Sequence, residues 1–144
     1  MPRYFTLEQA QAALPRAEEF LRKAMELKAA LEEAEGDWRV ESERIRMSGG
    51  ALVQRERLVG IVKRRESAAA QLRNALALAQ EPGCLVKDLD TGLLDFPTLF
   101  RGEEVYMCWK LGEPAIAFWH GAGEGFRGRK PIDRDFLENH QGAE

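Results

Sequence analysis

The sequence is poor in the residues that build disulfide frameworks, zinc knuckles and membrane spans. It has two cysteines in 144 residues, Cys84 and Cys108, and their wide separation fits neither a zinc knuckle nor a C-x-x-C redox pair. We expect two buried thiols in a reducing compartment rather than a disulfide. No apolar run approaches the length of a membrane-spanning helix, and the first residues lack the apolar core of a signal peptide. These absences predict a cytoplasmic protein with no membrane segment.

An excess of charge of one sign is also missing. The net charge of −3 gives no strong field that would favour nucleic acid or an anionic membrane surface. With 44% hydrophobic and 31% charged residues, the composition is that of a folded, charge-rich chain and not of a disordered one. We expect a single domain over residues 1–144, with a helical hairpin at 7–81, a sheet and loops at 84–132 and a polar tail at 133–144.

The first half of the chain is dominated by a helical pattern. Apolar residues recur at steps of three and four from Leu7 to Trp38, which predicts one long amphipathic helix. Thr6 and Gln9 have the spacing of a capping box at its start. Pro15 falls inside the pattern and predicts a kink or a restart near residues 11–15, because it removes one backbone hydrogen bond.

A second helix of the same kind follows. The glycine-rich break at 48–50 predicts a reversal of the chain, and a new apolar stripe runs from about Ala51 to Ala79. The stretch 80–83 contains Pro82 and Gly83, which end the helix. Two long helices joined by a short turn predict an antiparallel hairpin that resembles a coiled coil.

After Gly83 the apolar period changes to that of strands. Segments 84–89, 104–111 and 115–120 are predicted to form three short strands, the last two joined by a turn at Gly112-Glu113. This turn would place Met107 opposite Phe118 and Val105 opposite His120 on one face, with Cys108 opposite Ala117 and Tyr106 opposite Trp119 on the other. Both faces would be largely apolar, so we expect both to be covered.

The predicted fold is therefore α+β: a long antiparallel helical hairpin packed on a small sheet of about three antiparallel strands, with a glycine-rich C-terminal loop at 121–128. The helices would cover one face of the sheet. Loops around 96–100 and Phe126, or a second copy of the chain, would cover the other. The tail from Asp133 is expected to form one helical turn at Phe136-Leu137 and then to fray.

Several motifs together resemble a known family. They are Tyr4-Phe5-Thr6-Leu7-Glu8, Leu14-Pro15, the run from Val86 to Pro97, Val105-Tyr106-Met107-Cys108-Trp109, Leu111-Gly112-Glu113, Phe118-Trp119-His120 and Gly125-Phe126-Arg127-Gly128-Arg129. On these residues the chain resembles the uncharacterised bacterial family catalogued as domain of unknown function 2203, over about residues 4–132. The resemblance implies a grouping at the level of fold and carries no known activity.

One histidine and several carboxylates make up a candidate polar site. His120 ends a predicted strand beside a glycine loop, where functional side chains are often held on a rigid scaffold. A histidine with nearby carboxylates suits a divalent metal or acid–base chemistry. The candidate polar site is His120, Asp88, Asp90, Asp95, Glu124 and Lys87, of which His120, Asp88, Asp90 and Glu124 form the candidate metal site.

The same residues also have structural interpretations. The sequence Asp90-Thr91-Gly92 fits an Asx-type turn, and Asp95 fits a cap before Phe96-Pro97. The His120 ring fits packing on Trp119 or Phe118 with a structural hydrogen bond to a carboxylate. The sequence leaves both interpretations open.

Three cations follow the glycine loop. Arg127, Arg129 and Lys130 suit a phosphate or carboxylate ligand, although no strand–glycine–helix pattern of a nucleotide site surrounds them. Internal ion pairs are the alternative. The available acids are Asp88, Asp90, Asp95 and Glu113.

These features support three hypotheses for function. The first is a non-enzymatic interaction or assembly module that forms a homodimer through its helical arm and presents the sheet to a protein partner. The second is a metal-binding protein or metal-dependent enzyme, with a divalent metal as the candidate cofactor. The third is nucleic-acid binding through the basic stretch Lys63-Arg64-Arg65, against which the matching acids of the first helix argue.

Overall fold

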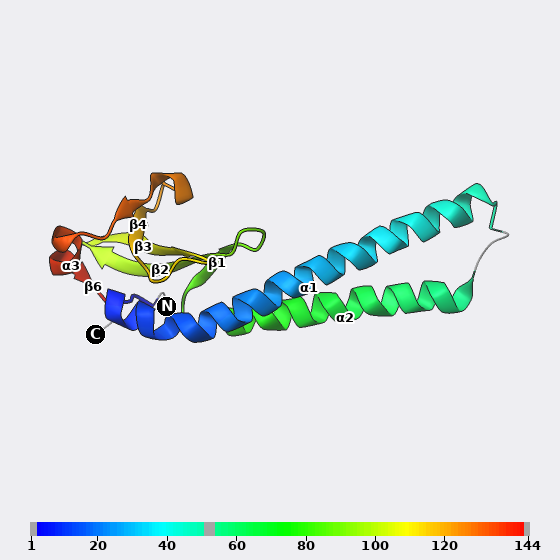
Figure 1. The fold of residues 1–144 in the computed structure, drawn as a ribbon, viewed down its shortest axis with the longest axis horizontal. Coiled ribbons are helices and arrows are strands. Elements are labelled where there is room, and N and C mark those ends of the chain that lie inside the picture. The colour runs from blue at the N-terminus through cyan, green and yellow to red at the C-terminus, as the bar shows by residue number, and fades with distance from the viewer. Residues whose placement is uncertain (1–2, 51–53, 143–144) are drawn as a thin grey trace.

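The computed structural model describes residues 3–50 and 54–142 and consists of a long helical arm joined to a sheet (Figure 1). The arm is formed by α1 (Leu7–Met47) and α2 (Arg55–Ala79). The strands are β1 (Leu85–Asp88), β2 (Leu93–Phe100), β3 (Glu103–Lys110), β4 (Phe118–Gly121), β5 (Lys130–Pro131) and β6 (His140–Gln141), with a short 3₁₀ turn η1 (Phe126–Gly128) and helix α3 (Arg134–Asn139). The predicted α+β class is confirmed. No described helix is both long enough and apolar enough to cross a bilayer.

Helix α1 begins as the sequence predicts. Thr6 accepts a hydrogen bond from the Gln9 backbone, and the Gln9 side chain accepts one from the Thr6 backbone, so the capping box is formed. The helix then runs without interruption through Pro15, and the predicted restart is wrong. Leu14 and Ala17 flank the proline in the core. Their burial offsets the roughly 3 kcal/mol that an interior proline costs a helix.

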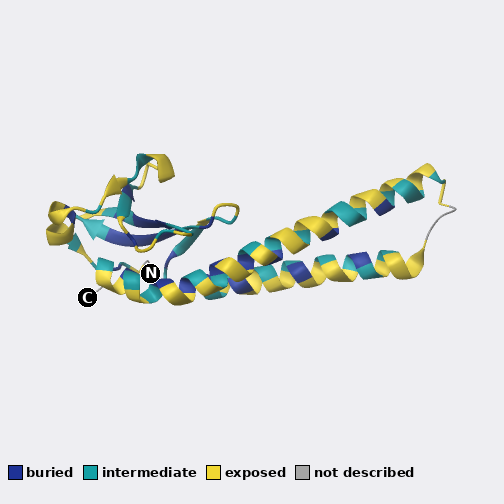
Figure 2. Ribbon diagram, in the orientation of Figure 1, coloured by how far each residue is buried: buried dark blue, intermediate teal, exposed yellow. Residues whose placement is uncertain are grey.

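Helix α2 ends at Ala79, as predicted, and its start is observed at Arg55. The predicted start at Ala51 lies outside the described residues. The buried alanines Ala68 and Ala75 lie seven residues apart along α2, so only a narrow seam is buried between the two helices (Figure 2).

The sheet has six strands in the described part of the chain, not the predicted three. The order is β1-β2-β3-β4-β5, with β6 paired to the free part of the β2 edge, and all pairs are antiparallel. Strand β2 covers residues 96–100, which were predicted to form loops, and it contains Pro97. Its missing N–H faces the edge between β1 and β6, where the Pro97 carbonyl accepts from Phe5, so the ladder to β3 is intact.

The pairing of β3 with β4 differs from the prediction by one residue. Cys108 lies opposite Phe118, and Tyr106 lies opposite His120, whereas the sequence placed Val105 opposite His120. A shift of one residue moves every side chain of a strand to the other face. His120 therefore shares its face with Tyr106 and Cys108.

The shift arises because the connection between β3 and β4 is longer than the predicted turn and covers residues 111–117. The Glu113 carbonyl accepts from the Trp109 indole at 3.1 Å, and its carboxylate accepts from the Lys110 backbone at 2.6 Å. Ile116 is buried in the core, and its N–H donates to the Gln11 side chain of α1. Ile116 thus packs against the helix and does not extend β4.

The main core lies between α1 and one face of the sheet. Leu14 and Leu21 of α1 pack with Leu94, Met107 and Trp109 of the strands, in the largest cluster of buried side chains. Because side chains alternate along a strand, the residues between these point to the opposite face. That opposite face carries the candidate site.

Helix α3 is followed directly by strand β6, so the predicted fraying after one helical turn is wrong for the described residues. Asp133 caps α3 by accepting from the Phe136 backbone, and Phe136 is fully buried. Its ring stacks with those of Trp119 and His140, at centroid distances of 5.0 and 5.1 Å. One buried aromatic residue therefore fixes a segment whose other residues are mostly polar.

Candidate functional site

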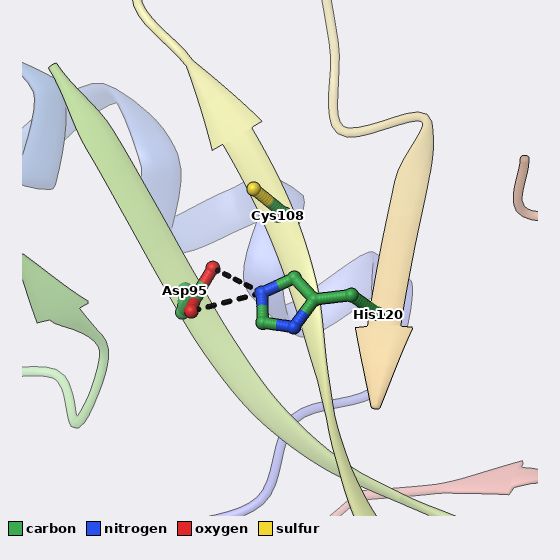
Figure 3. A group of neighbouring side chains, drawn as sticks. All are labelled: Asp95, Cys108 and His120. Carbon is green, nitrogen blue, oxygen red and sulfur yellow. Dashed lines mark hydrogen bonds and ion pairs between the residues drawn. The ribbon is translucent and has the colours of Figure 1, made fainter. Parts of the chain in front are cut away.

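Three neighbouring strands each place one buried polar or thiol side chain on the face turned away from α1. Asp95 of β2 pairs directly with Cys108 of β3. His120 of β4 pairs with Tyr106, which lies two residues before Cys108 on the same face of β3 (Figure 3). Their exposed fractions are 3%, 1% and 5%. One ligand-type atom from each residue lies within 4.8 Å of the other two. We call these three residues the strand cluster.

His120 is held by contacts at both ring nitrogens. Nδ1 lies 2.9 Å from the Gly121 carbonyl oxygen, and Nε2 lies 3.0 and 3.1 Å from the two carboxylate oxygens of Asp95. The Gly121 carbonyl oxygen only accepts, so the contact at Nδ1 is a hydrogen bond in the tautomer that carries a proton on Nδ1. Nε2 is thus the nitrogen directed into the cluster. Metal-binding histidines are oriented in this way when a carbonyl holds the other nitrogen.

Burial controls the chemistry of both cysteines. It raises the pKa of the Cys108 thiol to about 12; the charge of Asp95 contributes further, whereas Arg129 opposes the rise. The thiol is therefore protonated at neutral pH and is a poor nucleophile by itself. Burial also raises the pKa of Cys84 to about 11, and its thiol lies 3.2 Å from the Ala79 carbonyl. Both thiols are free and buried, as predicted.

Tyr106 packs against the His120 ring, with centroids 5.5 Å apart. The predicted packing on Trp119 or Phe118 is replaced by this contact, because the observed register places Tyr106 beside the histidine. The Tyr106 hydroxyl donates to Glu104 at 2.6 Å. This hydrogen bond, with burial, raises the pKa of Tyr106 to about 12, so the hydroxyl stays protonated.

A pocket of about 240 Å³ opens over the strand cluster. The side chains of the cluster form part of its wall, and Lys87 and Tyr106 extend the wall along β1 and β3. Glu124 and Phe126, from the connection after β4, line the other side. The cluster is therefore buried within the sheet yet borders an opening that a small molecule can enter.

Of the predicted site residues, His120 and Asp95 lie in the cluster, and Lys87 and Glu124 line its pocket. Glu124 is held in place because it accepts from the Gly121 backbone at 2.9 Å and from Lys130 at 2.6 Å. The hydrogen bond from Lys130 is the main reason that the pKa of Glu124 is lowered.

Asp88 and Asp90 lie elsewhere. The Asp88 carboxylate accepts from the backbone N–H groups of Asp90 and Thr91, at 2.7 and 3.3 Å, so the Asx-type turn is closed by Asp88 and not by Asp90 as predicted. These bonds lower the pKa of Asp88. Asp90 pairs with Lys28 of α1 at 2.5 Å. Among the described residues, neither carboxylate belongs to the group of ligand atoms around His120.

The three predicted anion-binding cations have different surroundings. Arg129 pairs with Glu113 at 2.6 Å, which is the internal pairing that the sequence allows as an alternative. Lys130 pairs with Glu124. Arg127 lines a second hollow beside the pocket. Only Arg127 is thus placed at an opening without a carboxylate partner among the described residues.

Cys108 is the member of the cluster that sequence reasoning missed, and Asp95 was assigned to the candidate site but not to its metal set. A signal for both was present in the alternation of strands. Once β2 is recognised as a strand, Asp95 and Cys108 face each other across the β2–β3 ladder. Pro97 and the neighbouring turn residues concealed that strand.

Fold and site together define a class: an α+β protein with a helical arm and a buried Asp–Cys–His cluster that borders a pocket. The family model described as "Uncharacterized conserved protein (DUF2203)" matches residues 3–132. The chain belongs to this family, which confirms the resemblance seen in the sequence. No curated protein and no solved structure matches the chain.

Proposed function

We propose that this protein binds a divalent transition metal, with zinc as the best-fitting ion, through Asp95, Cys108 and His120. The observation that carries the proposal is the convergence of a carboxylate oxygen, a thiol sulfur and an imidazole nitrogen within 4.8 Å of one another. Neighbouring ligand atoms around a tetrahedral zinc ion lie about 3.5 Å apart, given zinc–ligand distances of about 2.0–2.3 Å. On binding, the ion would draw the three ligand atoms from within 4.8 Å of one another to that spacing.

The ligand types and their number support a chemical role for the ion. Sulfur and nitrogen ligands select zinc over magnesium or calcium, which prefer oxygen alone. Three protein ligands leave a coordination position open, as in catalytic zinc sites, and the pocket lies beside the cluster. A metal bound there would polarise a small molecule or a water molecule. The proposed function is therefore metal-dependent chemistry on a small molecule.

The competing interpretation is a structural His120–Asp95 pair with no metal. In that case His120 would share a proton with the buried carboxylate, and Cys108 would only fill space. The orientation of His120 by the Gly121 carbonyl is compatible with both states. The two interpretations differ in the role of the thiol, because a metal requires Cys108 as a thiolate ligand and an ion pair does not.

Elemental analysis of the untagged protein tests the proposal. We expect about one zinc per chain in the parent, and loss of the metal in Asp95→Asn, Cys108→Ser and His120→Ala. Cys84→Ser is the matched control, because Cys84 is also a buried thiol but lies outside the cluster. It should keep the metal. A parent protein that contains no metal and takes up no zinc in a titration would contradict the proposal and leave the structural pair.

We further propose that the helical arm mediates self-association, as a coiled-coil-like homodimer. The observation in its favour is a set of exposed apolar residues on the part of the arm that lies away from the sheet: Val40, Met47 and Val59. Exposed apolar side chains on an extended helical pair are suited to a contact with another helix. A second copy of the chain offers the same surface.

A further inference from the structure

The pocket over the strand cluster has a neighbour. A second hollow of about 400 Å³ shares three lining residues with it, namely Leu93, Gly125 and Phe126. The far side of this hollow is lined by Lys110 and Arg127. Because they share these residues, the two hollows adjoin and are considered together as one groove, to which the first contributes the strand cluster and the second the two cations. We call it the basic groove.

The charges along the basic groove do not balance. Lys87, Lys110 and Arg127 line it, and no ion pair joins any of them to a carboxylate within the described residues. Two of the carboxylates along the groove are already bonded to cations or to histidine: Glu124 to Lys130 and Asp95 to His120.

The third carboxylate along the groove is Asp88. Asp88 lines the second hollow, and its oxygen accepts two backbone N–H groups of the turn. With Glu124 balanced by Lys130, the three cations Lys87, Lys110 and Arg127 outnumber the two remaining carboxylates, Asp88 and Asp95, so the lining of the groove has a net positive charge. Such a groove favours an anionic ligand.

The middle of the basic groove is apolar. Phe126 is 40% exposed, although its ring is held in place by two cations, the Arg129 guanidinium at 4.6 Å and Lys110 Nζ at 5.5 Å from the ring centroid. Arg129 is itself fixed by Glu113. Phe126 is thus a supported aromatic platform, with Leu93 beside it, on which the apolar part of a ligand can lie.

We propose that the basic groove binds a small organic anion, in which a carboxylate or phosphate group is joined to an apolar body. The anionic group contacts Lys110 and Arg127, since an arginine fork and a lysine charge together suit both groups. The apolar body lies on Phe126 and Leu93, and the other end of the molecule reaches the strand cluster. The last point rests on the proposed metal function, whereas the preference for an anion rests on the groove alone.

Calorimetric titration with simple probes tests this assignment. Phenyl phosphate and phenylacetate represent the two anion types, and 2-phenylethanol is the uncharged counterpart. At low ionic strength, where charge contacts are least screened, we expect at least one anion to bind about tenfold or more tightly than the alcohol. The tighter of the two anions identifies the ligand type. Equal binding of all three probes would overturn the proposal.

Two sets of variants sharpen the test. The double variant Lys110→Gln/Arg127→Gln should lose about tenfold or more in anion affinity and keep its metal content. Lys63→Gln on α2 is the distant charge control, and it should change neither the anion affinity nor the metal content. An anion affinity that survives the double variant would also overturn the proposal.

The metal content and the anion preference, measured on the same proteins, separate this proposal from the metal proposal. If the parent holds no metal but its anion binding depends on Lys110 and Arg127, the metal function fails and the groove stands. If metal is present and no anion is preferred, the groove assignment fails and the metal function stands. Where both are correct, His120→Ala should retain a weakened preference for the anion.

Discussion

His120 is the residue on which the candidate chemistry depends. The Gly121 carbonyl fixes one nitrogen and Asp95 faces the other, so the ring is oriented before any ligand arrives. The neighbouring thiol is neutral because burial raises the pKa of Cys108 to about 12. A cation that binds here must therefore displace the thiol proton, and this couples metal affinity to pH.

The first residue-scale prediction concerns that coupling. Between pH 7 and 9 the Cys108 thiol is protonated in the metal-free protein, since both values lie well below its pKa of about 12. Each zinc ion bound through the thiolate releases this proton, so affinity should rise with pH, by about tenfold per unit. Competition with a chelator of known affinity at several pH values measures the slope. Cys84→Ser, which keeps the cluster, should show the same slope as the parent. A pH-independent affinity in the parent would show that the thiol is not a ligand.

At the scale of elements, the turn from Asp88 to Gly92 sets the position of β2 and hence of Asp95. Asp88 closes the turn through its side chain, and Gly92 leaves it with a φ of 80°. The Gly92 carbonyl accepts from the Leu111 backbone at 2.8 Å, which ties the turn to the end of β3. The turn thus fixes one end of the ladder that brings Asp95 opposite Cys108.

Gly92→Ala tests the importance of this turn. A Cβ at Gly92 would lie 2.8 Å from the Leu111 Cβ, in addition to the strain of a positive φ. We expect a loss of about 1–3 kcal/mol in the free energy of unfolding, measured by urea denaturation. Gly102→Ala is the matched control, because Gly102 has a φ of 81° with no atom within 4 Å of the added Cβ. It should be less destabilising; equal losses would mean that the contact with Leu111 has no effect.

At the scale of the whole molecule, the arm and the sheet have separate tasks. Helix α1 has 41 residues, which gives a length of about 60 Å at 1.5 Å per residue. Only its first half packs into the main core against the sheet, and the remainder of the arm extends beyond the sheet (Figure 1). Arg57 and Arg64 of α2 pair with Glu41 and Asp37 of α1, which joins the two helices along that extension.

Light scattering tests the proposed self-association through the arm. We expect a dimer at tens of micromolar protein, and a monomer for the variant Val40→Glu/Val59→Glu, because buried charges would oppose a contact between exposed apolar faces. The helical content by circular dichroism should be unchanged. Asn74→Glu adds a charge at an exposed position of α2 and should remain dimeric. A monomeric parent at high micromolar concentration would rule the dimer out.

The sequence determined the helical half of this protein and several local details. The apolar period of 3.6, the capping box at Thr6 and the stop at 80–83 act through neighbours in the chain, so a linear pattern is enough to reveal them. A turn at 88–92 was also predicted from neighbouring residues, although its closing side chain is Asp88 and not Asp90. The family membership also followed from motifs that lie in the sequence.

Only the tertiary structure decided strand β2, the register of β4 and the composition of the strand cluster. Pro97 is tolerated in β2 because its missing donor faces the gap between β1 and β6, a gap that no local pattern describes. Ile116 leaves the strand because α1 offers it a buried place, and this sets His120 on the face of Cys108. Sheet pairing joins residues that are distant in sequence. Because side chains alternate between the two faces of a strand, a register error of one residue assigns every side chain to the wrong face. The chemistry of the site therefore depends on packing that the sequence encodes only through the whole fold.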